Sequence, residues 1–264
     1  MPTLWTSPSR PPARLQGLDA LRGLAMLWMT AFHFSFDLNY FGYIQQDFYL
    51  DPVWTWQRSA IVSLFLLAAG CGQAAAVVRG QGWPRFWWRW AQVAGCAALV
   101  TAASWIMFPR SFIYFGVLHG LAAMLIATRW LLVRGTPQAA LLAGGAMLIA
   151  LYWIAPAALN AWAGTEAAGL FNSRALNWLG LITRKPITED YVPLVPWLGV
   201  MLWGAAAGRW LLARRPHWLA LGATNRAAGA LLAALGRWSL SYYMLHQPVL
   251  IGALIAIGWL TGRA

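Results

Sequence analysis

Residues 17–38, GLDALRGLAMLWMTAFHFSFDL, form an apolar stretch that is long enough to cross a bilayer and yet carries four ionisable side chains. On an ideal helix these four fall within one stripe about 60° wide. They are Asp19, Arg22, His33 and Asp37. Ionisable groups inside a bilayer are costly, so they face the interior of a helix bundle. The stretch therefore predicts a transmembrane helix that forms one wall of a polar chamber.

The composition of the whole chain is that of an integral membrane protein. Of its 264 residues, 60% are hydrophobic and only 10% are charged, and the mean hydropathy is +0.55. Residues 1–16 hold four prolines and two arginines, which predicts a disordered cytoplasmic tail. Apolar runs recur over nearly all of 17–264, which predicts a single transmembrane domain.

Seven apolar runs predict an all-α bundle of about seven transmembrane helices. The predicted spans are 17–38, 58–78, 86–108, 112–132, 137–159, 192–212 and 234–260, with an amphipathic approach to the last span from Arg226. The segment 156–181 leaves open a re-entrant or eighth apolar segment.

The basic residues predict the orientation of this bundle. With the N-terminus in the cytoplasm, the cytoplasmic segments hold eleven arginines and no acidic residue, whereas the opposite segments hold six basic and five acidic residues. The cytoplasmic set is Arg10, Arg14, Arg79, Arg85, Arg89, Arg129, Arg134, Arg209, Arg214, Arg215 and Arg226. This asymmetry follows the positive-inside rule. It explains the net charge of +12 without nucleic acid and suits a bacterial inner (plasma) membrane.

His33 is the first candidate catalytic residue. Asp37 follows one helical turn later, where its carboxylate is expected to orient the imidazole and raise its basicity, as in general-base catalysis. The alternative is a histidine and a carboxylate paired only for packing.

Asp19 and Arg22 are spaced for an ion pair on one helix face. The arginine suits the phosphates of a cytoplasmic cofactor, because its guanidinium offers a fork of donors. The alternative is an arginine that marks the inner membrane interface, beside its carboxylate partner.

A second polar cluster lies in WSLSYYMLHQP, residues 238–248, where Tyr242, Tyr243 and His246 share a helix face. This face is expected either to orient substrate and donate to an oxyanion, or only to hydrogen-bond between helices. His119, in the predicted fourth span, would complete a chamber of three histidines. No histidine spacing typical of zinc accompanies them, and Cys71 and Cys96 both lie in apolar segments, so neither a metal site nor a disulfide is predicted.

Several motifs resemble known membrane acyltransferases. LDALRGLAMLWMTAFH, residues 18–33, resembles the first-helix signature of the acyltransferase-3 family. Other segments are similar to membrane proteins related to heparan-alpha-glucosaminide N-acetyltransferase: HFSFDLNYFG, FLLAAG, FGVLHGLA, PWLGVMLWGAAAGR and LGRWSLSYYMLHQPVLI.

The resemblance implies transfer of an acyl group, acetyl above all, from cytoplasmic acetyl-CoA to a hydroxyl or amine of a sugar-like acceptor outside. It implies that His33 is the catalytic histidine and that Arg22 lies near the donor. One feature departs from the family: the eukaryotic enzyme has its active histidine in the luminal segment after the first family helix, and the corresponding QQDFYLDPVWTW contains none.

A proton-coupled small-molecule transporter is the alternative function, because it too would line a membrane chamber with Asp, Arg and His. No inverted repeat between the halves of the chain supports it. The sequence leaves open the acceptor, the acyl chain length, an acyl-histidine intermediate, and whether the protein forms a homo-oligomer.

Overall fold

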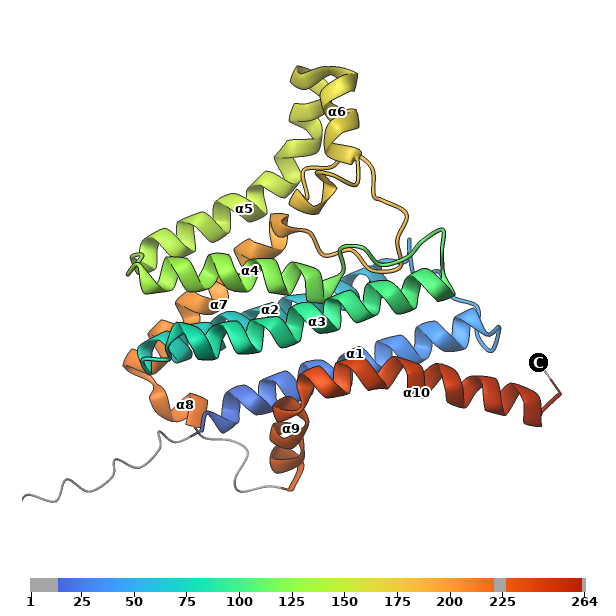
Figure 1. Ribbon diagram of the computed structural model, residues 1–264, viewed down its shortest axis with the longest axis horizontal. Helices are drawn as coiled ribbons and strands as arrows, with labels where there is room; N and C mark the ends of the chain where they lie inside the picture. Colours follow the sequence, from blue (N-terminus) through green and yellow to red (C-terminus); the bar gives the residue numbers. More distant parts are fainter. Residues whose placement is uncertain (1–13, 221–226, 263–264) are drawn as a thin grey trace, which may run out of the picture.

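The computed structural model describes residues 14–220 and 227–262, and within them the regular structure is helical apart from one isolated bridge between Phe115 and Tyr191 (Figure 1). The helices are α1 (Gln16–Tyr40), α2 (Pro52–Val78), α3 (Trp83–Met107), α4 (Val117–Val133), α5 (Gln138–Ala158), α6 (Gly164–Asn172), α7 (Leu194–Arg214), α8 (Pro216–Ala220), α9 (Ala227–Arg237) and α10 (Ser239–Leu260). A π-helical turn, η1 (Leu159–Ala163), joins α5 to α6, and a 3-10 turn, η2 (Asn177–Leu179), precedes α7. The predicted tail up to residue 13, together with Arg226 and Arg263, lies outside the described residues.

Four helical segments are long and apolar enough to cross a bilayer. They are Pro52–Val78, Trp83–Met107, Gln138–Ala161 and Ser239–Leu260. The chain is therefore an all-helical integral membrane protein. The remaining predicted spans correspond to α1, α4 and α7.

Three predicted boundaries were wrong by about a turn or more. We expected the last span to begin near residue 234, but α9 ends at Arg237 and α10 begins only at Ser239, because the chain leaves the helix at Trp238. We expected the second span to begin near residue 58, but α2 begins at Pro52, because Asp51 caps the helix by accepting from the Val53 N–H at 2.8 Å. We expected the fourth span to begin near residue 112, but α4 begins at Val117. Phe115 instead forms the bridge to Tyr191, and this extended pairing keeps the preceding residues out of the helix.

Glycines allow α2 and α7 to pack closely at the centre of the bundle. A Cβ atom added to Gly204 of α7 would lie 2.4 Å from the Leu67 carbonyl oxygen, and one added to Gly70 of α2 would lie 2.1 Å from that of Met201. The Cys71 thiol donates to the Gly204 carbonyl at 3.0 Å. Small residues at such a crossing let two backbones approach within a membrane bundle.

The crossing of α1 and α9 depends on glycine in the same way. In Figure 1, α9 runs across the α1–α10 pair at a steep angle. A Cβ atom on Gly23 would lie 1.9 Å from the Leu232 carbonyl oxygen, and one on Gly236 would lie 1.8 Å from that of Asp19. The glycine that follows Arg22 is thus required by packing.

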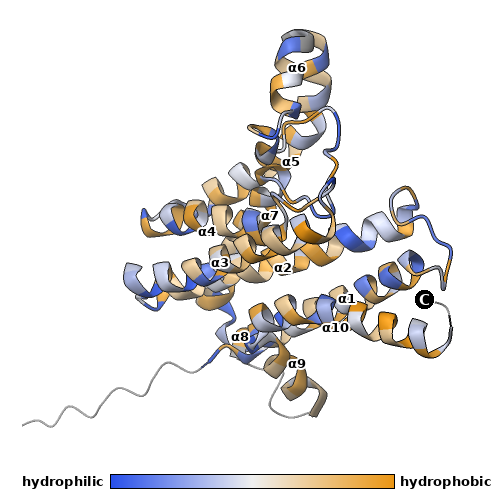
Figure 2. Ribbon diagram, turned by 45° about the vertical axis from the view of Figure 1, so that its right-hand side comes forward, coloured by the Kyte–Doolittle hydropathy of each residue, from blue (hydrophilic) through white to orange (hydrophobic). Residues whose placement is uncertain are grey.

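The helices present two different ends (Figure 1). At one, here called the basic end, α1, α3 and α5 begin and α2, α4 and α7 finish. Its described arginines are Arg14, Arg79, Arg85, Arg89, Arg129, Arg134, Arg209, Arg214 and Arg215. The opposite end, here called the loop end, carries the loops 41–51, 108–116 and 173–193. Figure 2 shows hydrophilic residues concentrated at both ends.

The segment 156–181 contains no further helix long enough to span a bilayer. The helix that begins with α5 continues into η1, and the chain then turns at Gly164, whose φ is +72°, so that α6 runs back beside η1 in a part that projects from the rest of the bundle (Figure 1). With nine residues, α6 is about 14 Å long, less than half of the hydrocarbon core. Asn172 then fixes the following loop, because its side chain pairs with Thr183.

Candidate functional site

A seam of polar side chains runs between α1 and α10. The rings of His33 and His246 contact each other with centroids 5.2 Å apart and planes inclined at 62°. About one turn toward the basic end, the Tyr242 hydroxyl lies 2.7 Å from Thr30 Oγ1. Since Thr30 donates its own proton to the Met26 carbonyl, Tyr242 is the donor to Thr30. The two helices therefore bring together two histidines that lie more than 200 positions apart in the sequence.

The hydrogen bonds of His246 fix its tautomer. Its Nδ1 lies 2.7 Å from the Tyr243 carbonyl oxygen, which only accepts, so Nδ1 carries the proton. In the neutral ring, Nε2 then holds a free electron pair. Nε2 is buried and has no hydrogen-bond partner, while the ring of Tyr242 stacks on His246 at 6.0 Å. The imidazole is thus held as a base that can accept a proton at Nε2.

Asp37 lies one turn from His33 but is bonded elsewhere. Its Oδ1 accepts from Gln247 Nε2 at 2.8 Å, whereas Oδ2 is buried without a partner. The expected contact between Asp37 and His33 is therefore replaced by one between Asp37 and the residue that follows His246. Gln247 was not among the predicted site residues, although an amide in an apolar helix next to a histidine was a usable signal.

Tyr243 lies on the same side of α10 and packs against α1. Its ring centroid is 5.7 Å from that of His246, and its side chain borders the cluster that contains Met26, Met29 and Phe32. Through its carbonyl it also holds His246 Nδ1. Its backbone and ring both position the imidazole.

The pair predicted near the start of α1 is part of a group of three charges. Asp19 is buried and accepts from Arg14 Nε at 2.7 Å and from Arg22 Nη1 at 3.5 Å. Arg22 lies against α2, where a Cβ atom on Gly72 would come within 2.3 Å of its Nη2. Arg22 therefore lies near the basic end, eleven residues or about 16 Å along α1 from His33. Arg14 was not predicted as a member of this group.

His119 has a structural position away from the other two histidines. Its Nδ1 accepts from the Gly116 N–H at 3.3 Å, and Nε2 lies 3.0 Å from Thr101 Oγ1. Thr101 in turn donates to the Ile113 carbonyl at 2.8 Å. Nδ1 thus caps the start of α4, and Nε2 links α4 to α3. Among the described residues, His33 and His246 contact each other, whereas His119 is bonded to Gly116 and Thr101. The predicted chamber of three histidines is therefore a pair.

Asp190 caps the loop end of α4. Its Oδ2 accepts from the Val117 N–H at 2.6 Å, and a Cβ atom on Gly116 would clash with the same oxygen at 2.3 Å. Burial raises the pKa of the Asp190 carboxyl above its ordinary value, although the backbone N–H groups of Val117 and Tyr191 oppose this shift. The motif FGVLHG therefore marks the start of α4, where the glycine at position 116 leaves space for the Asp190 carboxylate.

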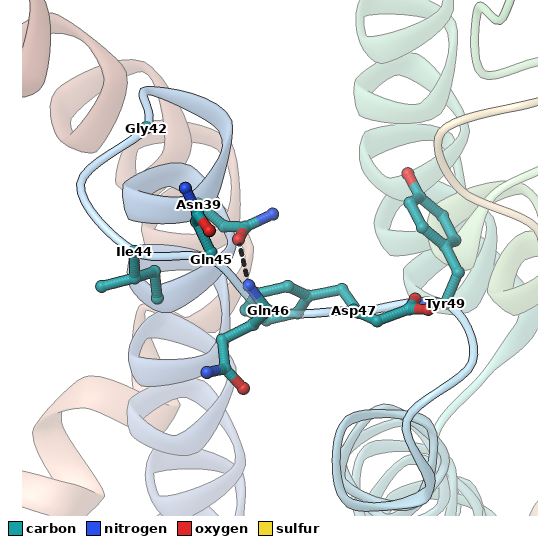
Figure 3. A pocket seen from close by; sticks show the side chains of 8 residues that line it. Asn39, Gly42, Ile44, Gln45, Gln46, Asp47 and Tyr49 are labelled. Atoms are coloured by element: carbon teal, nitrogen blue, oxygen red, sulfur yellow. Dashed lines mark hydrogen bonds between the residues drawn. The ribbon is translucent and has the colours of Figure 1, made fainter.

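The loop that follows α1 lines an open surface pocket at the loop end (Figure 3). The pocket has a volume of about 560 Å³. Asn39 Oδ1 accepts from the Gln46 N–H at 2.6 Å, and Asp47 Oδ1 accepts from the Tyr49 N–H at 2.9 Å. Lys185 lies 5.5 Å from the centre of the Tyr49 ring, and burial lowers the pKa of the lysine.

A second, apolar pocket of about 270 Å³ lies at the end of α5. His33 and His246 line neither of them.

Among residues 14–220 and 227–262, no group of three or more histidine, cysteine, aspartate and glutamate side chains has an arrangement that would hold a metal ion.

Comparison with known proteins gives one family. The family model described as heparan-alpha-glucosaminide N-acetyltransferase, catalytic, matches residues 14–248. The match contains the whole of α1 and the part of α10 that carries Tyr242, Tyr243 and His246. No curated protein and no solved structure shows significant similarity to the chain.

Proposed function

The chain belongs to the heparan-alpha-glucosaminide N-acetyltransferase catalytic family, and we propose that it moves an acetyl group from cytoplasmic acetyl-CoA to a sugar-like acceptor on the other side of the membrane. The family match over 235 of the 264 residues is the observation that carries this proposal. It makes the chain an acetyltransferase, so the transporter interpretation is not favoured. The donor, the side of the acceptor and the site residues are the parts that we propose.

We propose seven spans, formed by α1, α2, α3, α4, α5, α7 and α10, with the N-terminus in the cytoplasm. The arginines of the basic end support this orientation, because positively charged segments stay inside. The basic end would then face the cytoplasm of a bacterium, with the bundle in its inner membrane. Anionic acetyl-CoA would be attracted to that end.

Arg22 is the proposed contact for the donor. The phosphates of CoA are strong acceptors, and a guanidinium binds them through charge-assisted hydrogen bonds. Asp19 and Arg14 support this role by fixing the guanidinium near α2. The thioester would reach from Arg22 along α1 toward His33, a distance of about 16 Å.

The two histidines are the proposed centre of the reaction. The acceptor nitrogen or oxygen attacks the thioester carbonyl carbon, and the carbon–sulfur bond breaks as CoA leaves as a thiolate. The proton lost by the acceptor passes to an imidazole nitrogen and then to the thiolate. His33 is the proposed base, supported by His246, whose free Nε2 electron pair suits proton relay. Transient acetylation of His33 is the alternative route, for which ping-pong kinetics are expected.

Five further residues have proposed roles around this centre. Asp37 and Gln247 hold α1 and α10 together beside the histidines. Tyr242 or Tyr243 donates to the oxyanion that develops on the thioester carbonyl. For Tyr242 this requires that its hydroxyl first give up the hydrogen bond that it donates to Thr30. His119 supports the start of α4 and acts on the substrate only indirectly.

The donor site is tested by the thermal stability of the detergent-solubilised protein. A ligand that binds only the folded state raises the unfolding temperature. Acetyl-CoA and CoA should raise that of the wild type, whereas ATP should not, and Arg22→Ala should lose the shift. Arg110→Ala, at the loop end, is the matched control and should keep it. No shift with either CoA species would contradict the proposed donor.

A further inference from the structure

Arg129 is a buried cation at the basic end. It lies in the last turns of α4, and the residue is only 2% exposed. Arginine is almost never buried to this extent unless it is paired. A guanidinium buried to this extent is therefore expected to have a hydrogen-bond or ion-pair partner for each of its donor groups.

The guanidinium is paired only in part. Its Nη2 donates to the Gln81 carbonyl, whereas Nε and Nη1 are buried without a partner. The rings of Trp83 and Phe86 lie 5.5 Å from its central carbon. Among the described residues, the side-chain ion pairs join Asp19 to other arginines, and none involves Arg129. In the part of the chain that the structure describes, the guanidinium therefore has two free N–H donor groups and no carboxylate that balances its positive charge.

Two further unpartnered polar groups lie on the neighbouring turns. Thr128 Oγ1 and Gln73 Oε1 are both buried without a hydrogen-bond partner. Gln73 is seven residues after Leu66 and Thr128 is four after Met124, and Leu66 and Met124 pack in one cluster. By helical periodicity, Gln73 and Thr128 lie further along this α2–α4 contact toward the basic end. Both groups show that this part of the α2–α4 contact leaves polar atoms without protein partners.

The cover over Arg129 is aromatic and partly exposed. Trp83 begins α3 and is 37% exposed, while Phe86 beneath it is buried. Trp87 stacks on Trp83 at 6.0 Å and is 44% exposed. Tryptophans in this position are typical of the membrane–water interface. A ligand would therefore reach Arg129 at the level of the lipid headgroups, past the side chain of Trp83.

We propose that Arg129 is the centre of a phosphate-binding site between α2, α3 and α4. A phosphate ester would accept from the free Nε and Nη1 groups, and it would supply the missing negative charge. A phospholipid headgroup and a soluble phosphate ester share this chemistry. The interfacial position of the aromatic cover favours the headgroup. The site does not depend on acetyl transfer and stands apart from Arg22.

The test uses the full chain in dodecyl maltoside micelles, which contain no phosphate. The unfolding temperature is followed during titration with phosphatidylglycerol in one arm and with CoA in the other, and dioleoylglycerol serves as a lipid without phosphate. Arg129→Met should weaken the response to the phosphate ligand by about tenfold or more, because hydrogen bonds to a charged group are lost. Arg134→Met removes an exposed arginine that stacks on Trp130 and is the matched control. It should change the apparent affinity by less than about twofold.

Each arm identifies a source. A response to phosphatidylglycerol that depends on Arg129 assigns a lipid headgroup, and one to CoA assigns a soluble phosphate ester. The proposal is overturned if neither probe raises the unfolding temperature, if Arg129→Met and Arg134→Met respond alike, or if dioleoylglycerol matches phosphatidylglycerol. If Arg129→Met does not yield a monodisperse protein, Arg129→Lys replaces it. This variant keeps the charge without the fork of donors, and it should weaken binding beyond the twofold limit of the control.

Discussion

Replacement of Gly23 by alanine tests the crossing of α1 and α9. The added Cβ atom would lie 1.9 Å from the Leu232 carbonyl oxygen and 2.7 Å from its carbon. Since both atoms belong to the backbone of α9, no side chain can rotate away. One of the two helices would have to move by more than about 1 Å before the contact became tolerable.

The cost follows from two opposing effects. Overpacking of this kind costs about 1–3 kcal/mol, while alanine in place of glycine in a helix contributes about 0.5–1 kcal/mol of stability. We therefore expect Gly23→Ala to lower the free energy of unfolding by up to about 2.5 kcal/mol. Gly252→Ala in α10 is the matched control. A Cβ atom there meets nothing within 4 Å, so this variant should be as stable as the wild type or slightly more stable.

The assay is thermal unfolding in detergent, followed by the fluorescence of the 19 tryptophans. Gly23→Ala should unfold at a lower temperature than both the wild type and Gly252→Ala. Equal stability of Gly23→Ala and Gly252→Ala would refute the close approach of α9 to α1.

Two further predictions concern individual hydrogen bonds. Tyr242→Phe removes the donor to Thr30 but leaves Thr30 bonded within α1, so it should cost only about 0.6–1 kcal/mol of stability. An unchanged unfolding temperature would contradict this bond. Burial raises the pKa of Asp190 above 3.8, so the folded protein binds the proton more tightly than the unfolded chain, and the free energy of unfolding should fall as pH rises from 3.8 through the folded pKa. Asp190→Asn keeps an acceptor for the Val117 N–H and should remove this fall. Identical pH profiles of unfolding for the variant and the wild type would speak against a raised pKa of the Asp190 carboxyl in the folded protein.

Much of the helical framework could be predicted from local sequence. The predicted span 17–38 lies within α1, and the predictions 137–159 and 86–108 each end within one residue of α5 and α3. Long apolar runs signal such helices by length alone. The start of α2 could also have been found, because Asp51 followed by Pro52 is a typical helix start.

The start of α4 was wrong because a contact distant in sequence decides it. The residues before Val117 are apolar enough for a helix, but the bridge between Phe115 and Tyr191 keeps them extended. Nothing local indicates that bridge. The crossing of α9 over Gly23 is likewise a tertiary contact between segments some 200 residues apart.

The site was predictable in its residue types more than in its partners. Helical periodicity placed His33 on a polar face of α1 and His246 on one of α10, and the two rings do contact each other. It did not reveal that Asp37 pairs with Gln247, or that His119 is occupied by Gly116 and Thr101. Depth in the membrane follows from position along a helix, whereas the choice of partner depends on how the helices are rotated against one another.

The most direct measurement is acetyl transfer from labelled acetyl-CoA to glucosamine by the purified protein, compared with His33→Ala, His246→Ala and His217→Ala. His217 is exposed in α8 and serves as the matched control. If His33 is the base, its loss should abolish transfer while the unfolding temperature stays near that of the wild type. His246→Ala should slow transfer strongly, and His217→Ala should leave it unchanged. Full activity of a folded His33→Ala protein would contradict the assignment of the histidine pair as the centre of the reaction.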